Sequence, residues 1–352
     1  MESALHVKPG CCAGPAPAPR AHPRLLARKD YVDGILRGDR LMLARAITLI
    51  ESGRAADQAL AGQILEECLP RCGNSIRVGI TGVPGAGKST LIEALGRHLV
   101  ERGEKVAVLA VDPASPLSGG SILGDKTRMT ALAASELAFI RSSPARGAFG
   151  GVAQHTREAM LLCEAAGYCN ILVETVGVGQ SETAVRAMVD FFLLIALAGA
   201  GDELQGIKRG VMELADVVAI NKADGENVAA AERARAEAEN ALHYFPAQES
   251  GWTPRALACS AMTGSNIGAL WECVLAHHAL TAANGWRMRM RREQTRNWMH
   301  ELVAQGLRRR FESSAAVRSR MRALERDVLE GRTTSLAAAR ALLEMCDGPE
   351  PR

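Results

Sequence analysis

Aromatic residues and long apolar runs are both scarce in this 352-residue sequence. Phe, Trp and Tyr together make up 4% of the chain, which argues against a platform on which nucleic-acid bases stack. The longest apolar run, residues 191–201, covers only about half of the roughly 20 residues that a membrane-spanning helix needs. The sequence therefore excludes a transmembrane helix, and neither nucleic acid nor a membrane is an expected partner.

The sequence also lacks a large excess of either charge and has no closely paired cysteines. The 42 basic and 39 acidic residues leave a net charge of only +3, which gives no sign of a polyanionic partner. The nine cysteines form no C-x-x-C pair, and Cys68 and Cys72 have no histidine nearby, so no zinc site is expected. An odd number of thiols without a secretory signal indicates a protein of a reducing compartment.

Lysine is rare, with 7 residues against 35 arginines, so each lysine is a candidate for a place where a compact ammonium matters. The 47% of hydrophobic residues, by contrast, suffice for a large core.

The chain divides by pattern into four parts. Residues 1–26 form a Pro/Ala-rich tail, 27–73 a helical lead-in, 74–280 an α/β domain and 281–352 a helical arm. Prolines in the tail argue against a transit peptide, so the expected location is the bacterial cytoplasm; the mitochondrial matrix applies only if the tail is such a peptide. In the third part, apolar runs alternate with helical segments, which predicts a doubly wound, mostly parallel sheet. The runs are 76–81, 106–111, 137–140, 171–174, 191–197, 217–221 and 256–260.

The strongest motif is a glycine-rich phosphate loop between the run 76–81 and a predicted helix at 89–100. Its backbone N–H groups and the helix N-terminus favour phosphate, Lys88 reaches the β- and γ-phosphates, and Ser89 can bind Mg²⁺. The motif consists of Gly82, Val83, Pro84, Gly85, Ala86, Gly87, Lys88, Ser89 and Thr90.

A second motif predicts a guanine site. Asn221, Lys222 and Asp224 follow the run 217–221, and a carboxylate accepts hydrogen bonds from both the ring N–H and the amino group of guanine. Adenine lacks that donor pair, so Asp224 favours GTP over ATP. The stretch Ser260, Ala261 and Met262 is a weaker candidate for a backbone donor to the guanine carbonyl.

Two further loops suit Mg²⁺ and the γ-phosphate. Asp112 closes the run 106–111, and the Gly/Ser-rich loop 113–128 that follows has the composition of a switch segment. Glu174 closes another run where a carboxylate can hold Mg²⁺ or its water, and the N–H of Gly177 can sense the γ-phosphate. Gln180 is three residues beyond Gly177, which weakens its case as the residue that orients the attacking water.

These stretches together resemble the MeaB/ArgK family of metallochaperone P-loop GTPases, which includes the methylmalonic aciduria type A protein. The resemblance spans roughly residues 30–310, and one departure is Ala198, where relatives often carry proline before the loop 199–210. The stretches are GVPGAGKST, VDPASPLSGGSILGDKTRM, RSSPARGAFGGVAQHT, ILVETVGVGQSE, GAGDELQGIKRG and NKAD.

The resemblance implies a homodimeric GTPase that gates the loading, protection and repair of an adenosylcobalamin-dependent acyl-CoA mutase. The cobalamin is then held by the mutase, and an adenosyltransferase is a further expected partner. The resemblance assigns Mg²⁺-side roles to Asp112, Asp125 and Glu174. The loop 199–210 becomes a third switch facing the mutase, and its active polar groups are Asp202, Gln205 and Lys208.

Hydrolysis is expected to be slow in the free protein, with Lys88, Glu174, Gly177, Gln180 and Lys208 as the candidate catalytic groups. A cation delivered on complex formation can accelerate phosphoryl transfer about 10³–10⁵-fold, and Lys208 is the candidate for it.

Three alternatives stay open. They are a nucleotide-dependent regulator of amino-acid transport, a metal-insertion GTPase, and a nucleic-acid-binding arm suggested by 12 arginines against 5 acidic residues in 285–327. Asp224 argues against the first because it disfavours adenine, and scattered histidines argue against the second.

Overall fold

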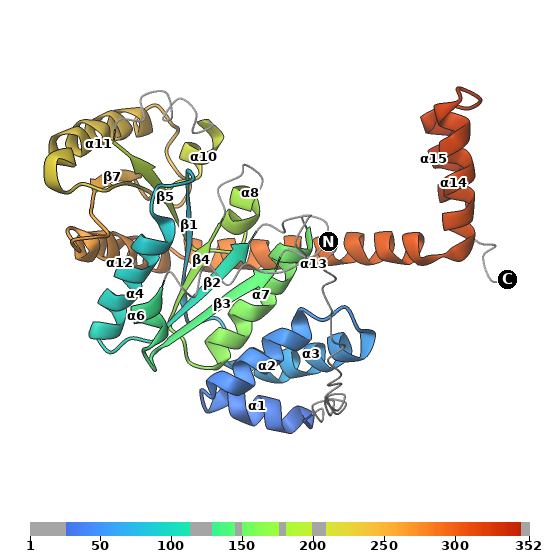
Figure 1. Cartoon of the computed structure of the whole chain (residues 1–352), viewed down its shortest axis with the longest axis horizontal. Helices are drawn as coiled ribbons and strands as arrows, with labels where there is room; N and C mark the ends of the chain where they lie inside the picture. The colour runs from blue at the N-terminus through green and yellow to red at the C-terminus, as the bar shows by residue number, and fades with distance from the viewer. Residues whose placement is uncertain (1–25, 113–128, 145–149, 176–180, 199–208, 346–352) are drawn as a thin grey trace, which may run out of the picture.

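The computed structural model describes residues 26–112, 129–144, 150–175, 181–198 and 209–345. Within these ranges seven strands form one sheet in the order β3-β2-β4-β1-β5-β6-β7, and every neighbouring pair is parallel. Helices lie on both faces of the sheet (Figure 1), which confirms the doubly wound α/β fold. The strands are β1 (Ile76–Gly82), β2 (Val106–Asp112), β3 (Ala138–Pro144), β4 (Asn170–Glu174), β5 (Phe191–Leu197), β6 (Val217–Asn221) and β7 (Arg255–Ala258).

One face of the sheet is covered by α4 (Lys88–Glu101), α6 (Thr130–Ala133) and α12 (Ile267–Ala283). The core there contains fully buried side chains of both layers, among them Ile80, Leu91 and Trp271. Because alternate residues of each strand face opposite layers, strands buried on both sides read as continuous apolar runs. β6 and β7 are covered on the opposite side by α11 (Val228–Leu242), whose buried face is built from alanines.

The N-terminal helices add a third layer. α1 (Arg28–Leu36), α2 (Arg40–Ile50) and α3 (Ala55–Cys68) pack on α7 (Gly150–Ala165), which itself packs on the sheet. Asp39 caps α2 by accepting hydrogen bonds from the backbone N–H groups of Leu41 and Met42, at 2.8 and 3.2 Å. The short 3₁₀ turn η1 (Leu69–Arg71) then leads into β1.

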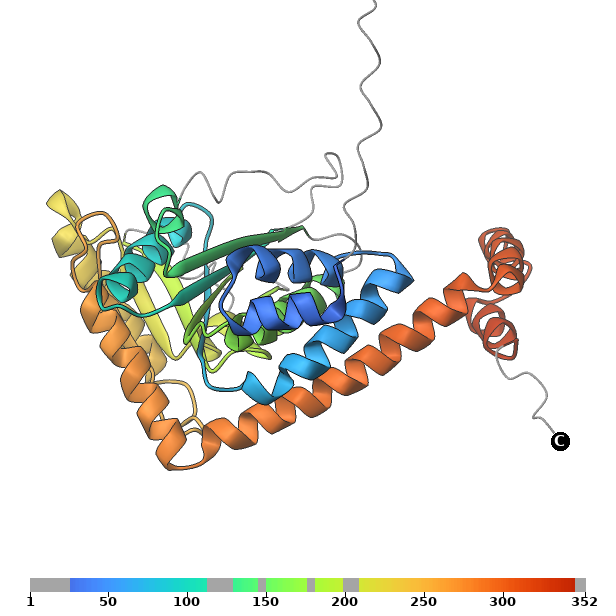
Figure 2. The same ribbon diagram turned by 90° about the horizontal axis from the view of Figure 1, so that it is seen from below.

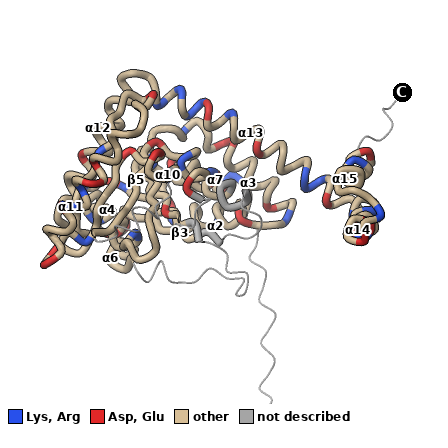
Figure 3. Tube along the Cα trace, turned by 90° about the horizontal axis from the view of Figure 1, so that it is seen from above, with Lys and Arg blue, Asp and Glu red and all other residues tan. Residues whose placement is uncertain are grey.

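The C-terminal part forms an elongated arm. α13 (Trp286–Ser313) leaves the body beside α12, and its far end carries α14 (Ala315–Leu329) and α15 (Ser335–Leu343), as Figures 1 and 2 show. Arginines recur along α13, where they account for the blue positions in Figure 3. The chain turns sharply at Ser314, whose backbone is extended and whose hydroxyl caps α14.

The predicted strands agree with the structure to within a few residues. The largest differences are β3, which runs to Pro144 instead of residue 140, and β7, which ends at Ala258 instead of 260. Within the described ranges, no helix is both long and apolar enough to span a membrane. The division of the chain into four domains stays a prediction.

Candidate functional site

The glycine-rich loop begins where the central strand β1 ends. Gly82 has a φ of +157°, and a Cβ on it would lie only 2.4 Å from the carbonyl oxygen of Ile195. Gly87 has a φ of +86°, and its Cβ would lie 2.7 Å from the side-chain nitrogen of Asn221. Both positions therefore require glycine. Pro84 and Gly85 are exposed at the tip of the loop, Val83 is half-buried and Ala86 is buried.

Helix α4 starts directly after this loop, so its first backbone N–H groups face the edge of the sheet at which the strands end. Lys88, its first residue, folds back over the loop, and its Nζ donates to the carbonyl oxygens of Gly82 and Val83 at 2.8 and 3.2 Å. Burial lowers the pKa of Lys88, while the carboxylates of Glu174 and Glu182 act in the opposite direction. The ammonium group of Lys88 thus lies against the loop that would surround a bound triphosphate.

Ser89 and Glu174 lie together beside the loop. The Ser89 Oγ donates to the Glu174 Oε1 at 3.0 Å, and Glu174 is the last residue of β4, the strand next to β1. Thr90, by contrast, is exposed on the first turn of α4.

These oxygens have the chemistry that Mg²⁺ prefers, since this ion is usually held by one or two carboxylates together with phosphate oxygens. Asp112 ends β2, the other neighbour of β4, and so places its backbone at the same edge of the sheet. The residues that would hold Mg²⁺ are therefore Ser89, Glu174 and, by position, Asp112. When bound, the ion would neutralise charge on the phosphates.

Asn221 ties the phosphate loop to the next loop of the site. Its side-chain nitrogen donates to the Ala86 carbonyl at 2.8 Å, and its side-chain oxygen accepts from the Ala261 backbone N–H at 3.1 Å. The side chain is 1% exposed. The amide of Asn221 thus joins two loops of the site, and its role in reading guanine, which the family resemblance implies, stays a prediction.

Asp224 lies on the rim of the same edge and is held by Ser260. The buried Ser260 hydroxyl donates to the Asp224 carboxylate and also accepts the Thr263 backbone N–H at 3.2 Å. Lys222 adopts a left-handed backbone with φ of +61° and is exposed, as is Met262. The carboxylate that would select guanine is thus fixed by a neighbour 36 residues away in sequence.

Several predicted residues lie outside the described residues. They are Asp125, Gly177, Gln180, Asp202, Gln205 and Lys208. Their proposed switch and catalytic roles stay predictions. The structure does bring together the loop 82–90, Glu174, Asn221, Asp224 and the stretch 260–262 at one edge of the sheet.

Two features of the site were missed by the sequence reasoning. The buried hydroxyls of Thr81 and Thr175 are 2.8 Å apart and join the ends of β1 and β4. Glu182, on the short helix α8 (Ser181–Arg186), is buried and acts electrostatically on Lys88. A polar residue at the end of a largely apolar strand was the available signal for Thr81.

A family model described as methylmalonyl-CoA mutase-associated GTPase MeaB matches residues 43–316. The GTPase ArgK of Escherichia coli is 49% identical over 272 residues, which cover 77% of this chain and 82% of the relative. A mouse protein named methylmalonic aciduria type A homolog, mitochondrial, is 43% identical over 321 residues, 88% of this chain and 77% of the relative.

A solved structure agrees with the sequence relatives. The crystal structure of a LAO/AO transport system kinase superposes with a TM-score of 0.72 at 37% identity, covering 91% of this chain and 97% of that one. The family model and the ArgK relative are named GTPases, which supports GTP hydrolysis by this chain, and the phosphate loop, the Ser89–Glu174 pair and the Asp224 loop are the predicted parts of its site. The chain belongs to the MeaB family of P-loop GTPases.

Proposed function

We propose that this GTPase gates the loading of adenosylcobalamin into an acyl-CoA mutase, and that it protects and repairs the loaded mutase. The mutase itself holds the cobalamin, and an adenosyltransferase is the proposed donor of the cofactor. The client is methylmalonyl-CoA mutase or a mutase of a closely related acyl-CoA.

The observation that carries the proposal is the extent of the family match. It covers residues 43–316, and so includes α3, the whole nucleotide site and α13 as well as the generic GTPase motifs. A mutase-associated protein needs surfaces beyond the nucleotide site. The match over most of α2, over α3 and over α13 supports a shared partner as well as a shared reaction.

We expect hydrolysis to be slow in the free protein. Phosphoryl transfer depends on positioned charge, and a cation supplied on complex formation can accelerate it about 10³–10⁵-fold. Lys88 lies in the phosphate loop itself. We propose that Lys208 is moved into the site when the mutase binds.

The test is GTP hydrolysis by the full-length protein with and without purified methylmalonyl-CoA mutase. We expect the mutase to raise the rate, and Lys208→Ala to abolish the increase while leaving GTP affinity unchanged. Lys29→Ala provides the control, because it also removes one of the few lysines but on the exposed surface of α1, outside the residues matched by the family model. A rate that the mutase does not change would contradict the proposed partner, whereas stimulation that survives Lys208→Ala would contradict only the role of this lysine.

We further propose that the functional unit is a homodimer joined by the arm. In the described part of the chain, no residue of α13 is fully buried. Met299, Val303 and Leu307 follow one another at intervals of four residues and are 54%, 55% and 62% exposed. An apolar stripe of this kind on an isolated helix is typical of a surface that packs against another protein chain.

A further inference from the structure

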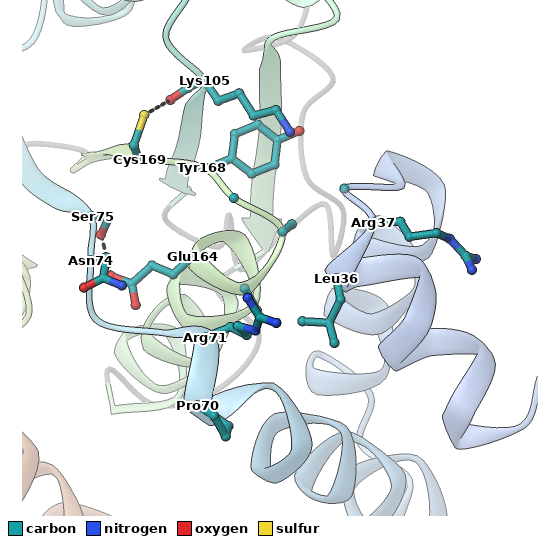
Figure 4. A pocket seen from close by; sticks show the side chains of 14 residues that line it. Leu36, Arg37, Pro70, Arg71, Asn74, Ser75, Lys105, Glu164, Tyr168 and Cys169 are labelled. Atoms are coloured by element: carbon teal, nitrogen blue, oxygen red, sulfur yellow. Dashed lines mark hydrogen bonds between the residues drawn. The ribbon is translucent and has the colours of Figure 1, made fainter.

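A second cavity lies at the edge of the sheet opposite to the phosphate loop. Its volume is about 710 Å³, which is within the range of small-molecule sites. Its walls come from the end of α1, from η1 and the residues after it, from the start of β2, and from the turn between α7 and β4 (Figure 4). The nucleotide site is formed where these strands end, so this cavity is separate from it.

Three cations line the cavity. Arg71 and Lys105 approach it from different sides, and Arg37 stands at its rim with its guanidinium directed outward (Figure 4). Within the described residues, none of these three cations forms an ion pair. Two or three uncompensated positive charges around one concave surface favour an anion.

Glu164 is the one acidic side chain among the described residues that line the cavity, and it does not neutralise these cations. Its carboxylate pairs with Arg77 at 2.8 Å and accepts hydrogen bonds from the Ser75 hydroxyl and, at 2.7 Å, from the Gly73 N–H. Burial acts to raise the pKa of Glu164, but the Arg77 charge and these hydrogen bonds outweigh it and keep the pKa below its usual value. Glu164 therefore serves the fold, and the lining keeps a net positive charge.

Lys105 is held in a defined place at this surface. Its Nζ lies 5.8 Å from the centre of the Tyr168 ring. A Cβ on Gly38 would come within 3.2 Å of the same Nζ, and Gly38 has a φ of +80° that side chains rarely adopt. The two glycine turns at Gly38 and Gly167 thus leave room for the ammonium group beside an aromatic wall.

We propose that this cavity binds a small phosphorylated metabolite that carries at least two negative charges. Arg71 and Lys105 would bind its phosphoryl oxygens, because charge-assisted hydrogen bonds to phosphate are among the strongest that proteins make. Leu36, Pro70 and the Tyr168 ring would contact its less polar part. Bound GTP or GDP cannot satisfy this site, since the phosphate loop holds the nucleotide at the other edge of the sheet.

The test is calorimetric titration with inorganic pyrophosphate, using full-length protein saturated with GDP and with Mg²⁺ in excess of the pyrophosphate. Filling the phosphate loop with GDP leaves the second cavity as the place for the probe. We expect one pyrophosphate per chain. Arg71→Gln and Lys105→Gln should each weaken binding by about tenfold or more, as the loss of one charge-assisted hydrogen bond predicts.

Arg54→Gln is the matched control. Arg54 is an exposed arginine of the same N-terminal layer, it lies outside the cavity lining, and it has no ion pair within the described residues. This variant should bind pyrophosphate as the wild type does. An equal loss in Arg54→Gln, or unchanged binding in both cavity variants, would overturn the proposal, because the probe would then sense only general charge or another place.

A second readout needs no variant. Cys169 is exposed and lines the cavity, so pyrophosphate should slow its alkylation in the GDP-filled wild type, measured by peptide mass mapping. The site would be refuted if millimolar pyrophosphate gave no heat of binding in the calorimeter and also did not slow the alkylation of Cys169. Release of GDP by pyrophosphate would also refute it, since the probe would then occupy the phosphate loop.

Discussion

At the scale of single residues, selection of the base depends on one carboxylate and the hydroxyl that holds it. Asp224→Ala should reduce GTP affinity strongly and leave ATP affinity nearly unchanged, because a charged hydrogen-bond acceptor contributes about 1.5–3 kcal/mol. Competition between GTP and ATP for a fluorescent nucleotide measures the preference. Equal affinity of the wild-type protein for both nucleotides would contradict this account of Asp224.

Ser260→Ala should give a smaller effect in the same assay. Its hydroxyl donates to the Asp224 carboxylate but need not contact the base itself. We expect a loss of about 1 kcal/mol in GTP binding, typical of one hydrogen bond, with no change for ATP. Thr263→Ala is the control, since this neighbour contacts Ser260 through its backbone. A larger loss than in Asp224→Ala would show that Ser260 has another role.

Sequence reasoning reached the site residues whose chemistry is local. Lys88 and Ser89 follow from the spacing of one loop, and Asp224 follows from a short motif after a strand. The link from Asn221 to Ala86 and the Ser260–Asp224 bond join segments 135 and 36 residues apart. Such contacts depend on the order of strands in the sheet, which the motifs do not contain.

At the scale of elements, one buried ion pair attaches α13 to the body. Arg291 donates to both carboxylate oxygens of Asp190, at 2.7 and 2.6 Å, and also to the backbone carbonyls of Gly73 and Ser75. Asp190 directly precedes β5 and also accepts the Arg77 backbone N–H at 3.0 Å. The pair thus joins the arm to the starts of two central strands.

Arg291→Ala should destabilise the protein by about 3–5 kcal/mol, because it leaves a buried carboxylate unpaired. Urea unfolding measures the free energy of unfolding. The control is Arg308→Ala on the same helix, whose pair with Glu312 is exposed and should matter little. Equal losses in both variants would contradict a special role for Arg291.

Arg291→Ala should also change how the free energy of unfolding depends on pH. Burial alone raises the pKa of Asp190, but the hydrogen bonds and charge of Arg291, together with Arg77, hold it below its usual 3.8. In the wild type this stabilisation is complete above pH 3.8 and is lost as pH falls through the lower folded value.

In Arg291→Ala, burial should instead raise the pKa of Asp190, so that proton uptake favours the folded variant as pH falls. The difference in unfolding free energy between wild type and variant should therefore narrow from about pH 7 to about pH 4.5. Urea unfolding at several pH values checks this. A gap that stays constant or widens on acidification would contradict it.

The elements were largely predictable because continuous apolar runs identify buried parallel strands. The exact ends of the helices and strands were harder to predict. β3 continues through Arg141, Ser142 and Ser143 because its neighbour β2 supplies hydrogen bonds to polar residues as readily as to apolar ones. The break between α13 and α14 at Ser314 was not predicted, although a serine before a helical run is a known capping signal.

At the scale of the whole molecule, the arm projects from the body and carries exposed apolar residues (Figure 1). If the arm joins two chains, light scattering should give a molar mass twice the 37.4 kDa of one chain. Val303→Glu combined with Leu307→Glu should give monomers, because charges replace apolar contacts in the interface. Leu41→Glu, which alters a similarly exposed leucine on α2, should leave the dimer intact. Monomeric wild-type protein would contradict the dimer.

The direction in which the arm leaves the body was not predictable from sequence. Helical periodicity identified α13, but its position depends on contacts with distant segments. Arg157 donates to the Gln294 carbonyl at 3.1 Å and stacks 4.8 Å from the Trp298 ring. Nothing in the sequence around Arg157 predicts that it contacts Gln294 and Trp298 on α13.

The central claim is that the bound nucleotide controls the interaction with the mutase. A nucleotide can bias the partner only if the GTP and GDP forms bind it with different free energies. The direct measurement is calorimetric titration of methylmalonyl-CoA mutase into this protein, loaded with Mg²⁺ and either a non-hydrolysable GTP analogue or GDP. The account predicts clearly different affinities in the two states, and equal affinities would contradict it.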